Sequence, residues 1–264
     1  MRKYWKVIKN TWEEMITYRL NFAMWRARVV FQTLTLYFLW SAILPSGVTL
    51  LGYSQSLMLT YVLGASFVGS IVTSSRSGSI GDEINQGNLS NFLLRPMNYF
   101  LYWFSKDLGD KAMNISFSIV ELFLLFLILK PPIFIQSEPV YLALFLMSLI
   151  SAVVIYFFIN VIIGMIGFWS PEIWGPRFIF TILISFFAGG LFPLDILPRN
   201  IFLFFQYLPF SYLLYFPLKI YLGQIPILEI ILGITVSFFW SIILYLTMKK
   251  IWNKGLRVYS AQGG

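Results

Sequence analysis

Long apolar runs without charged residues alternate with short polar breaks along this 264-residue chain. No charge lies between Arg28 and Arg76, or between Glu138 and Glu172. A helix needs about 20 apolar residues to cross a hydrocarbon core of about 30 Å. The pattern therefore predicts an all-α integral membrane protein with about six transmembrane helices. These spans cover about residues 22–44, 54–75, 111–129, 140–168, 178–192 and 227–248.

Two segments interrupt this pattern, and they differ in composition. Residues 76–98, between the second and third spans, are polar and charged. Residues 193–226, between the fifth and sixth spans, are apolar but repeatedly broken by proline, which lacks an N–H and ends helices. Within this segment neither residues 201–208 nor residues 212–222 are long enough to span a bilayer. We therefore expect short or re-entrant helices there.

The first 20 residues predict a separate helix. At about 100° per residue, one arc of residues 2–16 is apolar and the adjoining arc is charged. The apolar arc holds Trp5, Ile8, Trp12, Met15 and Ile16, and the charged arc holds Arg2, Lys6, Lys9 and Glu13. This predicts an amphipathic helix on the cytoplasmic membrane surface rather than a frayed tail. Residues 21–264 then form a single transmembrane domain.

The distribution of basic residues gives the spans an orientation. With both termini in the cytoplasm, only Lys130, Arg199 and Lys219 of the 19 Lys and Arg residues face outward, which leaves 16 on the inner side. Cytoplasmic loops of membrane proteins carry such an excess of positive charge. We therefore expect a multi-pass protein of the cytoplasmic (inner) membrane, with residues 76–98 inside the cell and residues 193–226 outside. The net charge of +8 then reflects membrane lipid and not nucleic acid.

Composition excludes several kinds of chemistry. Only 11% of the residues are charged and 58% are hydrophobic, whereas a soluble domain has about 25% charged residues. The absence of Cys and His excludes disulfides, thiolate or imidazole metal sites, and Ser-His or Cys-His nucleophile pairs. The chain also lacks the phosphate-binding pattern G-x-x-x-x-G-K-[ST]. We therefore expect no catalytic, cofactor-binding or metal-binding residue and no enzyme activity in this chain.

Two polar residues lie inside predicted spans. Glu121 is near the middle of the third span and Asn160 is in the fourth. An ionised side chain at this depth costs about 2.5–3.5 kcal/mol on insertion scales, so Glu121 should face protein or water. It either lines a pathway or carries a proton, or it forms a hydrogen bond between helices to a partner such as Asn160. Arg26 and Arg28, at the inner end of the first span, are expected to extend to the headgroups.

The polar segment and the Pro-rich segment both carry recognisable patterns. The first consists of Asp82, Glu83, Ile84, Gly87 and Leu89, followed by Leu93, Leu94, Arg95, Pro96 and the aromatic Tyr99. In residue type and spacing it resembles the cytoplasmic loop of the ABC-2 type permease family, in particular its half-size, six-span members. The second, with Gly190, Phe192, Pro193, Pro198, Pro209 and Gly223, resembles the outer segment of the same family. The similarity covers essentially the whole chain.

The resemblance implies a permease subunit of an ATP-driven exporter for hydrophobic or amphiphilic compounds, either drugs or lipid-like molecules. Such a subunit pairs with a second permease, identical or related, and with two cytoplasmic ABC ATPase subunits that hold ATP and Mg. The segment 76–98 then forms a short coupling helix that docks on the ATPase. Gly87 can break its backbone, Leu89, Leu93 and Leu94 offer apolar contacts, and Asp82, Glu83 and Arg95 offer charges.

Two other functions remain as alternatives from the sequence. A secondary transporter driven by an ion gradient would use Glu121 as its proton or ion site. A membrane-embedded enzyme that modifies lipids would need converging acids, bases or metal ligands near one interface, and the chain offers only scattered carboxylates for this. No sequence pattern identifies the cargo, the direction of transport or the partner permease.

Overall fold

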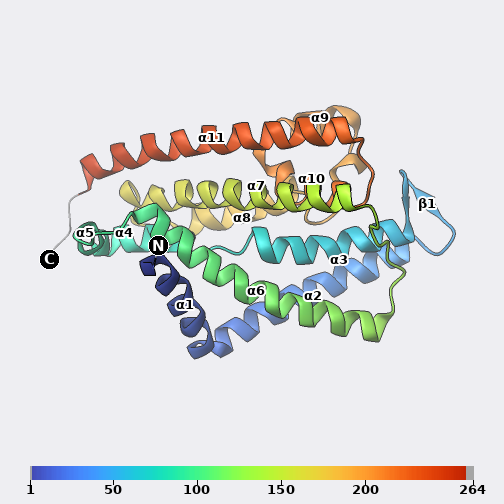
Figure 1. Ribbon diagram of the computed structural model, residues 1–264, viewed down its shortest axis with the longest axis horizontal. Helices are drawn as coiled ribbons and strands as arrows, with labels where there is room; N and C mark the ends of the chain where they lie inside the picture. The colour runs from blue at the N-terminus through green and yellow to red at the C-terminus, as the bar shows by residue number, and fades with distance from the viewer. Residues whose placement is uncertain (1, 260–264) are drawn as a thin grey trace.

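The computed structural model describes residues 2–259 as a bundle of long helices with one minimal hairpin. Four of its helices are long and apolar enough to cross a membrane, and a fifth, α2, has 25 residues. The long helices run along the longest axis of the molecule (Figure 1). They are α2 (Arg19–Ile43), α3 (Gln55–Val72), α6 (Tyr99–Leu129), α7 (Pro139–Gly164, continued by η2, Met165–Phe168) and α11 (Ile227–Val258). An all-α membrane fold is therefore confirmed.

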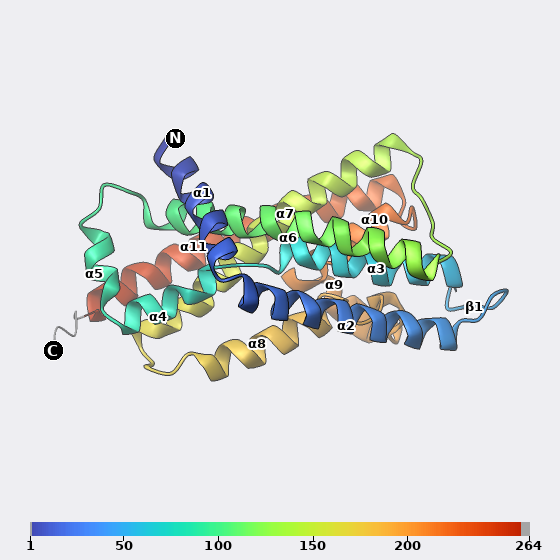
Figure 2. The same ribbon diagram turned by 90° about the horizontal axis from the view of Figure 1, so that it is seen from below.

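The helix found at the predicted fifth span, residues 178–192, is displaced toward the N-terminus and is too short to cross a bilayer. Helix α8 (Trp174–Phe187) has 14 residues, which gives a length of about 21 Å and not the 30 Å of a hydrocarbon core. The helix ends where Gly189 adopts a φ of +80° and the chain turns into the Pro-rich segment. Helix α8 lies on the outside of the bundle (Figure 2), and Ile184 is its only buried residue.

The two ends of the bundle carry different short elements (Figure 1). At one end, which we call the loop end, lie the start of α1, the end of α11 and the helices of residues 76–98. At the other, the Pro-rich end, lie the hairpin and the segment 193–226. The loop end holds α1 (Arg2–Thr17), η1 (Ser77–Ser79), α4 (Ile80–Asn85) and α5 (Asn88–Leu93). The Pro-rich end holds β1 (Thr49–Leu50), β2 (Tyr53–Ser54), η3 (Leu194–Ile196), α9 (Arg199–Gln206), η4 (Pro209–Tyr212) and α10 (Tyr215–Tyr221).

The Pro-rich segment forms short helices, as predicted, but much of it is buried in the bundle. Every residue from 211 to 220 is buried, and α10 packs against α3 and α7. The largest apolar cluster of the protein joins α10 to those two helices, with Tyr61, Ile155 and Leu218 among its members. The main core therefore lies near the Pro-rich end. A second, smaller cluster fills the loop end.

Helix α6 begins twelve residues before the predicted third span. Asn98 caps its first turn, because the Asn98 Oδ1 accepts a hydrogen bond from the Leu101 N–H at 3.0 Å. The charged residues between positions 106 and 111 lie on this helix and do not end it. The helix ends at Lys130, whose φ of +44° turns the chain toward two prolines. The extra turns of α6 supply the surface on which α1 and the 76–98 segment pack.

Helix α1 coincides with the predicted amphipathic helix and packs along α6. A Cβ on Gly109 of α6 would lie 2.8 Å from the Ile8 carbonyl oxygen, so the two backbones are in close contact. Thr11 and Met15 are buried there, whereas Trp5 and Ile16 are exposed. The apolar arc is thus divided between a protein contact and an open face. Placement of that open face on a membrane surface stays a prediction.

Candidate functional site

The 76–98 segment folds into η1 and two short helices, where the sequence predicted one coupling helix. Gly87 separates α4 from α5 with a φ of +74°, a left-handed conformation that costs other residues about 1–2 kcal/mol. Its N–H donates to the Ile84 carbonyl at 3.1 Å, which closes the last turn of α4. The predicted backbone break at Gly87 is therefore present in the structure.

Helix α4 is seated directly on the end of α7 through three glycines. A Cβ on Gly167 would lie 2.9 Å from the Gly81 carbonyl oxygen, and a Cβ on Gly81 would lie 2.9 Å from the Gly164 carbonyl oxygen. Small residues allow helices to approach at backbone distance in this way. Ile80 and Ile84 are buried on the same side of α4. A displacement of α4 must therefore displace the end of α7 as well.

Helix α5 turns one apolar face inward and another outward. Leu89 is 0% exposed and Phe92 is 2% exposed, and they pack beside Tyr99 and Trp103. The prediction that Leu89 offers a contact to a partner is therefore wrong, because this side chain fills the core of the loop end. Leu93 and Leu94 are 49% and 86% exposed, as an apolar docking surface requires.

The charged residues of the segment are divided in the same way. Glu83 accepts a hydrogen bond from the Tyr99 hydroxyl at 2.7 Å and one from the Trp103 Nε1 at 3.3 Å, so its carboxylate is used inside the chain. Asp82 and Arg95 are exposed. Both line a polar surface hollow of about 380 Å³ on this end. Pro96 is exposed as well, and its carbonyl accepts a hydrogen bond from Lys3 of α1. Of the residues predicted for coupling, the exposed ones are thus Asp82, Leu93, Leu94, Arg95 and Pro96.

A row of polar residues on α6 connects this segment to the interior of the bundle. At its start, Asp107 accepts hydrogen bonds from the Arg76 N–H at 2.7 Å, the Ser77 N–H at 3.0 Å and the Ser75 hydroxyl at 2.7 Å. The carboxylate therefore caps η1 and attaches the beginning of the segment to α6. We call this set the α6 polar row, and it comprises Asp107, Asp110, Lys111, Asn114, Ser118 and Glu121.

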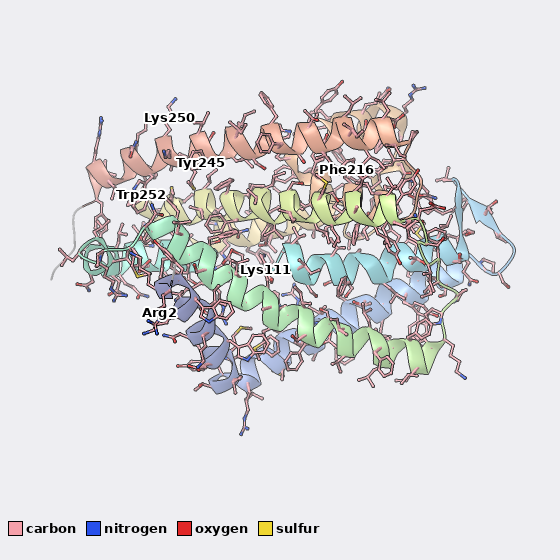
Figure 3. All side chains as sticks on the ribbon, in the orientation of Figure 1. Arg2, Lys111, Phe216, Tyr245, Lys250 and Trp252 are labelled. Atoms are coloured by element: carbon pink, nitrogen blue, oxygen red, sulfur yellow. The ribbon has the colours of Figure 1, made fainter. Side chains whose placement is uncertain are left out.

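Lys111 supports the end of α3 from within this row. Its ammonium group donates to the Val72 carbonyl at 3.1 Å and to the Ser74 carbonyl, so it satisfies acceptors at the C-terminus of α3. The side chain lies between α6 and α3 (Figure 3). The end of α3 and the start of the 76–98 segment are therefore both fixed to α6.

The row continues through a chain of hydrogen bonds into α2. The Arg76 Nε donates to Asp110 at 2.9 Å, and the Asn114 amide donates to the same carboxylate at 3.2 Å. Asn114 in turn accepts from the Arg26 guanidinium at 3.3 Å. Arg26 donates from its Nε to the Glu121 Oε1 at 2.7 Å and also contacts the second oxygen of that carboxylate.

The pair of Arg26 and Glu121 corrects one prediction and the suggested partner in another: Glu121 does form a contact between helices, but to Arg26. Arg26 is buried and does not extend to the headgroups, because Glu121 on the neighbouring helix neutralises it. Glu121 does not contact Asn160, whose amide donates instead to the Tyr156 carbonyl of its own helix at 3.1 Å. A signal for the row existed in the sequence, since positions 107, 111, 114, 118 and 121 recur every three or four residues on one helix face. No sequence pattern pointed to Arg26 as the partner.

At the Pro-rich end two charged residues, Asp195 and Lys219, are turned inward and pair with each other, whereas Arg199 is exposed. The Lys219 ammonium donates to Asp195 at 2.7 Å, to the Tyr53 hydroxyl at 3.0 Å and to the Gln224 amide oxygen at 2.6 Å. Burial lowers the pKa of the Lys219 amine, and the Asp195 carboxylate acts in the opposite direction. Burial, and then the charge of Asp195, raises the pKa of the Tyr53 hydroxyl, which donates to Asp195 at 2.8 Å.

The residues predicted for the outer segment differ in their burial. Pro193 and Pro209 are buried, Gly190 and Phe192 are half-buried, and Pro198 is exposed at the start of α9. The exposed Gly223 has a φ of +65° and ends α10. The structure places all six of them at one end of the bundle. Within residues 2–259, no three carboxylates come together in an arrangement that could hold a metal ion.

Comparisons with known proteins add one identification. A family model described as ABC-2 family transporter protein matches residues 30–263, which is most of the chain. A search among curated proteins finds no match. The matched region includes the 76–98 segment, the α6 polar row and the Pro-rich end.

Proposed function

Because this chain belongs to the ABC-2 transporter family, we propose that it is the transmembrane permease subunit of an ATP-driven exporter of hydrophobic or amphiphilic compounds. It is a multi-pass membrane protein and a component of an ABC transporter, and members of this family associate with ABC ATPases. We further propose that two ATPase subunits and a second permease complete the assembly in the cytoplasmic membrane.

The observation that carries the proposal is the division of the 76–98 segment into a buried and an open side. A plain connecting loop would not need the glycine contacts of α4 with α7 or the capping of η1 by Asp107. Leu94, which is almost fully exposed, has no packing role in this chain. An exposed leucine with charged neighbours of both signs is typical of a docking surface that combines an apolar contact with a polar rim.

The attachment of the segment supports a mechanism of rigid transmission. An ATPase that moves on binding ATP would push on α4 and α5 as one unit. Because α4 is in backbone contact with the end of α7, and η1 is bonded to α6, the displacement passes to two long helices at once. The bonds from Asp110 through Asn114 to Arg26 extend this connection to α2. Rigid-body rocking of packed helices is a known form of such a transition.

Two further features support the proposed assembly and its energy source. The apolar side chains of Phe178, Ile179 and Ile182 on α8 are exposed, so this face is open to lipid or to a second permease. Glu121 is paired with the buried Arg26, so its carboxylate is already occupied by a cation of the same chain. ATP hydrolysis in a partner subunit therefore accounts for the energy better than an ion gradient acting through Glu121.

The test compares one docking residue with a matched residue at the opposite end. Leu94→Asp is expected to reduce copurification with the ATPase subunit by tenfold or more, because removal of an interface hot spot costs about 2 kcal/mol or more. Leu51→Asp, at an exposed leucine of the hairpin, is the control and should copurify normally. Unfolding midpoints of both variants should match the parent. If Leu94→Asp binds the ATPase as well as Leu51→Asp does, the surface around Leu94 does not dock the ATPase.

A further inference from the structure

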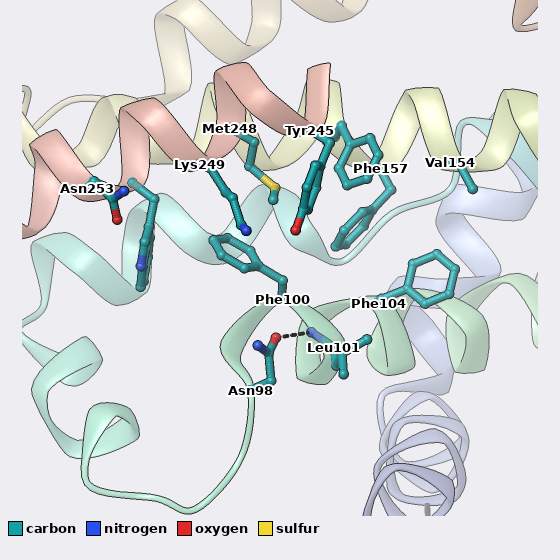
Figure 4. A pocket seen from close by; sticks show the side chains of 12 residues that line it. Asn98, Phe100, Leu101, Phe104, Val154, Phe157, Tyr245, Met248, Lys249 and Asn253 are labelled. Carbon is teal, nitrogen blue, oxygen red and sulfur yellow. Dashed lines mark hydrogen bonds between the residues drawn. The ribbon is translucent and has the colours of Figure 1, made fainter. Parts of the chain in front are cut away.

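An open groove on the side of the bundle lies outside the proposed docking surface. It has a volume of about 780 Å³ and runs between α6 and α11, with α7 as its floor (Figure 4). Aromatic side chains dominate its walls, and none of its 12 lining residues is acidic. The lining consists of Asn98, Phe100, Leu101, Phe104, Val154, Phe157, Phe158, Tyr245, Met248, Lys249, Trp252 and Asn253.

The groove is polar at one end and apolar at the other. Asn98, Lys249 and Asn253 lie toward the loop end, whereas Val154 and Phe157 lie at the opposite extreme (Figure 4). Lys249 follows directly on the uncharged run of residues 230–248, so it marks the level at which α11 leaves the hydrocarbon. The polar end is therefore at headgroup depth, and the apolar end is deeper in the membrane.

The polar end has cationic and donor groups that are free for a ligand. Among residues 2–259, the Lys249 ammonium has no carboxylate partner and lies 4.9 Å from the centre of the Tyr245 ring. Asn98 uses its carbonyl oxygen to cap α6, so its amide N–H groups remain as donors beside the positive end of that helix. An anionic group fits these neighbours.

We propose that this groove binds one anionic phospholipid, with the phosphate at Lys249 and Asn98 and an acyl chain along Phe100, Phe104 and Phe157. Basic pockets between membrane helices are known to bind anionic headgroups. The combination of an aromatic channel with a single unpaired cation at one end matches an amphiphile with an anionic head. This assignment adds a lipid ligand to the proposed function and does not depend on the ATPase.

The neighbouring lysine provides a matched control for the headgroup contact. Lys250 follows Lys249 on α11, is exposed, and does not line the groove. Its side chain extends away from the bundle (Figure 3). Lys249→Glu and Lys250→Glu therefore make the same change in net charge at adjacent positions, and only the first alters the groove.

The experiment is native mass spectrometry of the purified protein with added phosphatidylglycerol or zwitterionic phosphatidylcholine. We expect one phosphatidylglycerol to be retained, with at least about five-fold preference over phosphatidylcholine, which corresponds to one cationic contact. Lys249→Glu should abolish the preference and Lys250→Glu should preserve it. Equal binding of the two lipids to the parent protein, or an equal loss in both variants, would overturn the proposal.

A second pair of variants tests the acyl-chain part without a charge change. Val154→Trp fills the deep end of the groove, whereas Leu246→Trp adds the same side chain to an exposed position of α11 outside it. Only Val154→Trp should reduce phosphatidylglycerol retention. Thermal unfolding of each variant in detergent checks that the fold is intact. Because the measurement needs no ATPase subunit, its failure would leave the proposed export function standing, and loss of ATPase binding would leave this site standing.

Discussion

The loop end and the Pro-rich end of this protein differ in where their charged residues lie. At the loop end Asp82 and Arg95 are exposed, and neither forms an ion pair within residues 2–259. The apolar Leu94 is exposed at the same end. At the Pro-rich end Asp195 and Lys219 are paired inside the bundle. The open arrangement of the first end is what the proposed docking of an ATPase requires, whereas Asp195 and Lys219 at the second end satisfy each other.

The largest expected effect on stability comes from breaking the ion pair between Asp195 and Lys219 at the Pro-rich end. Lys219→Met leaves Asp195, whose side chain is 25% exposed, without its cation; breaking a fully buried pair from one side costs about 3–5 kcal/mol, and this partly buried pair should cost less. We expect a clear fall in the unfolding midpoint in detergent. Arg199→Met, an exposed cation of the same segment, serves as the control and should unfold like the parent.

A double variant sharpens this result. Lys219→Met combined with Asp195→Leu removes both charges, so most of the lost stability should return, because neither charge is left uncompensated. If the double variant is no more stable than Lys219→Met alone, the ion pair is not the reason for the closed arrangement of this end.

A smaller effect is expected from the contact between α4 and α7. Gly167→Val places side-chain atoms against the Gly81 backbone, and such overpacking costs about 1–3 kcal/mol. ATP hydrolysis by the assembled transporter should also lose its stimulation by cargo, because α4 is displaced from α7. Gly175→Val is the control, since a Cβ at Gly175 meets no atom within 4 Å. If cargo still stimulates ATP hydrolysis normally in Gly167→Val, the contact between α4 and α7 does not transmit the movement of the ATPase.

The smallest effect is expected from a charge at the rim of the open end. Asp82→Asn should leave unfolding unchanged and slow association with the ATPase a few-fold at low salt, because rim charges act mainly on the association rate. Surface plasmon resonance at two salt concentrations measures this. Glu14→Gln, on the exposed side of α1, should show neither change. If the association rates of Asp82→Asn and the parent depend on salt in the same way, the charge of Asp82 does not act at the interface.

The sequence was sufficient for the elements that depend on local pattern. Uncharged apolar runs located α2, α3 and α7 to within a few residues, and prolines located the short helices of residues 193–226. Helix α8 ends five residues before the predicted boundary, because the chain turns at Gly189. Helix α6 extends twelve residues before the predicted third span, because Asp107 and Lys111 are bonded by neighbouring segments and do not interrupt the helix.

Contacts between distant segments could not be obtained from the same patterns. Arg26 and Glu121 are 95 positions apart, and periodicity says which face of each helix is polar but not which helices meet. Leu89 and Leu94 are equally apolar, yet one is buried and the other exposed, because only the packing of α5 on Tyr99 decides between them. The sequence therefore delimits the 76–98 segment but does not sort its residues into inward and outward groups.

The most direct test of the account uses the absence of native cysteine in this chain. Leu94→Cys, labelled with a membrane-impermeant maleimide, should react in inverted membrane vesicles and not in intact cells, and bound ATPase should protect it. Leu51→Cys at the opposite end should show the reverse accessibility and no protection. Labelling of Leu94→Cys from outside intact cells, or reaction that is unchanged when the ATPase is bound, would contradict the claim that this leucine lies in the docking surface.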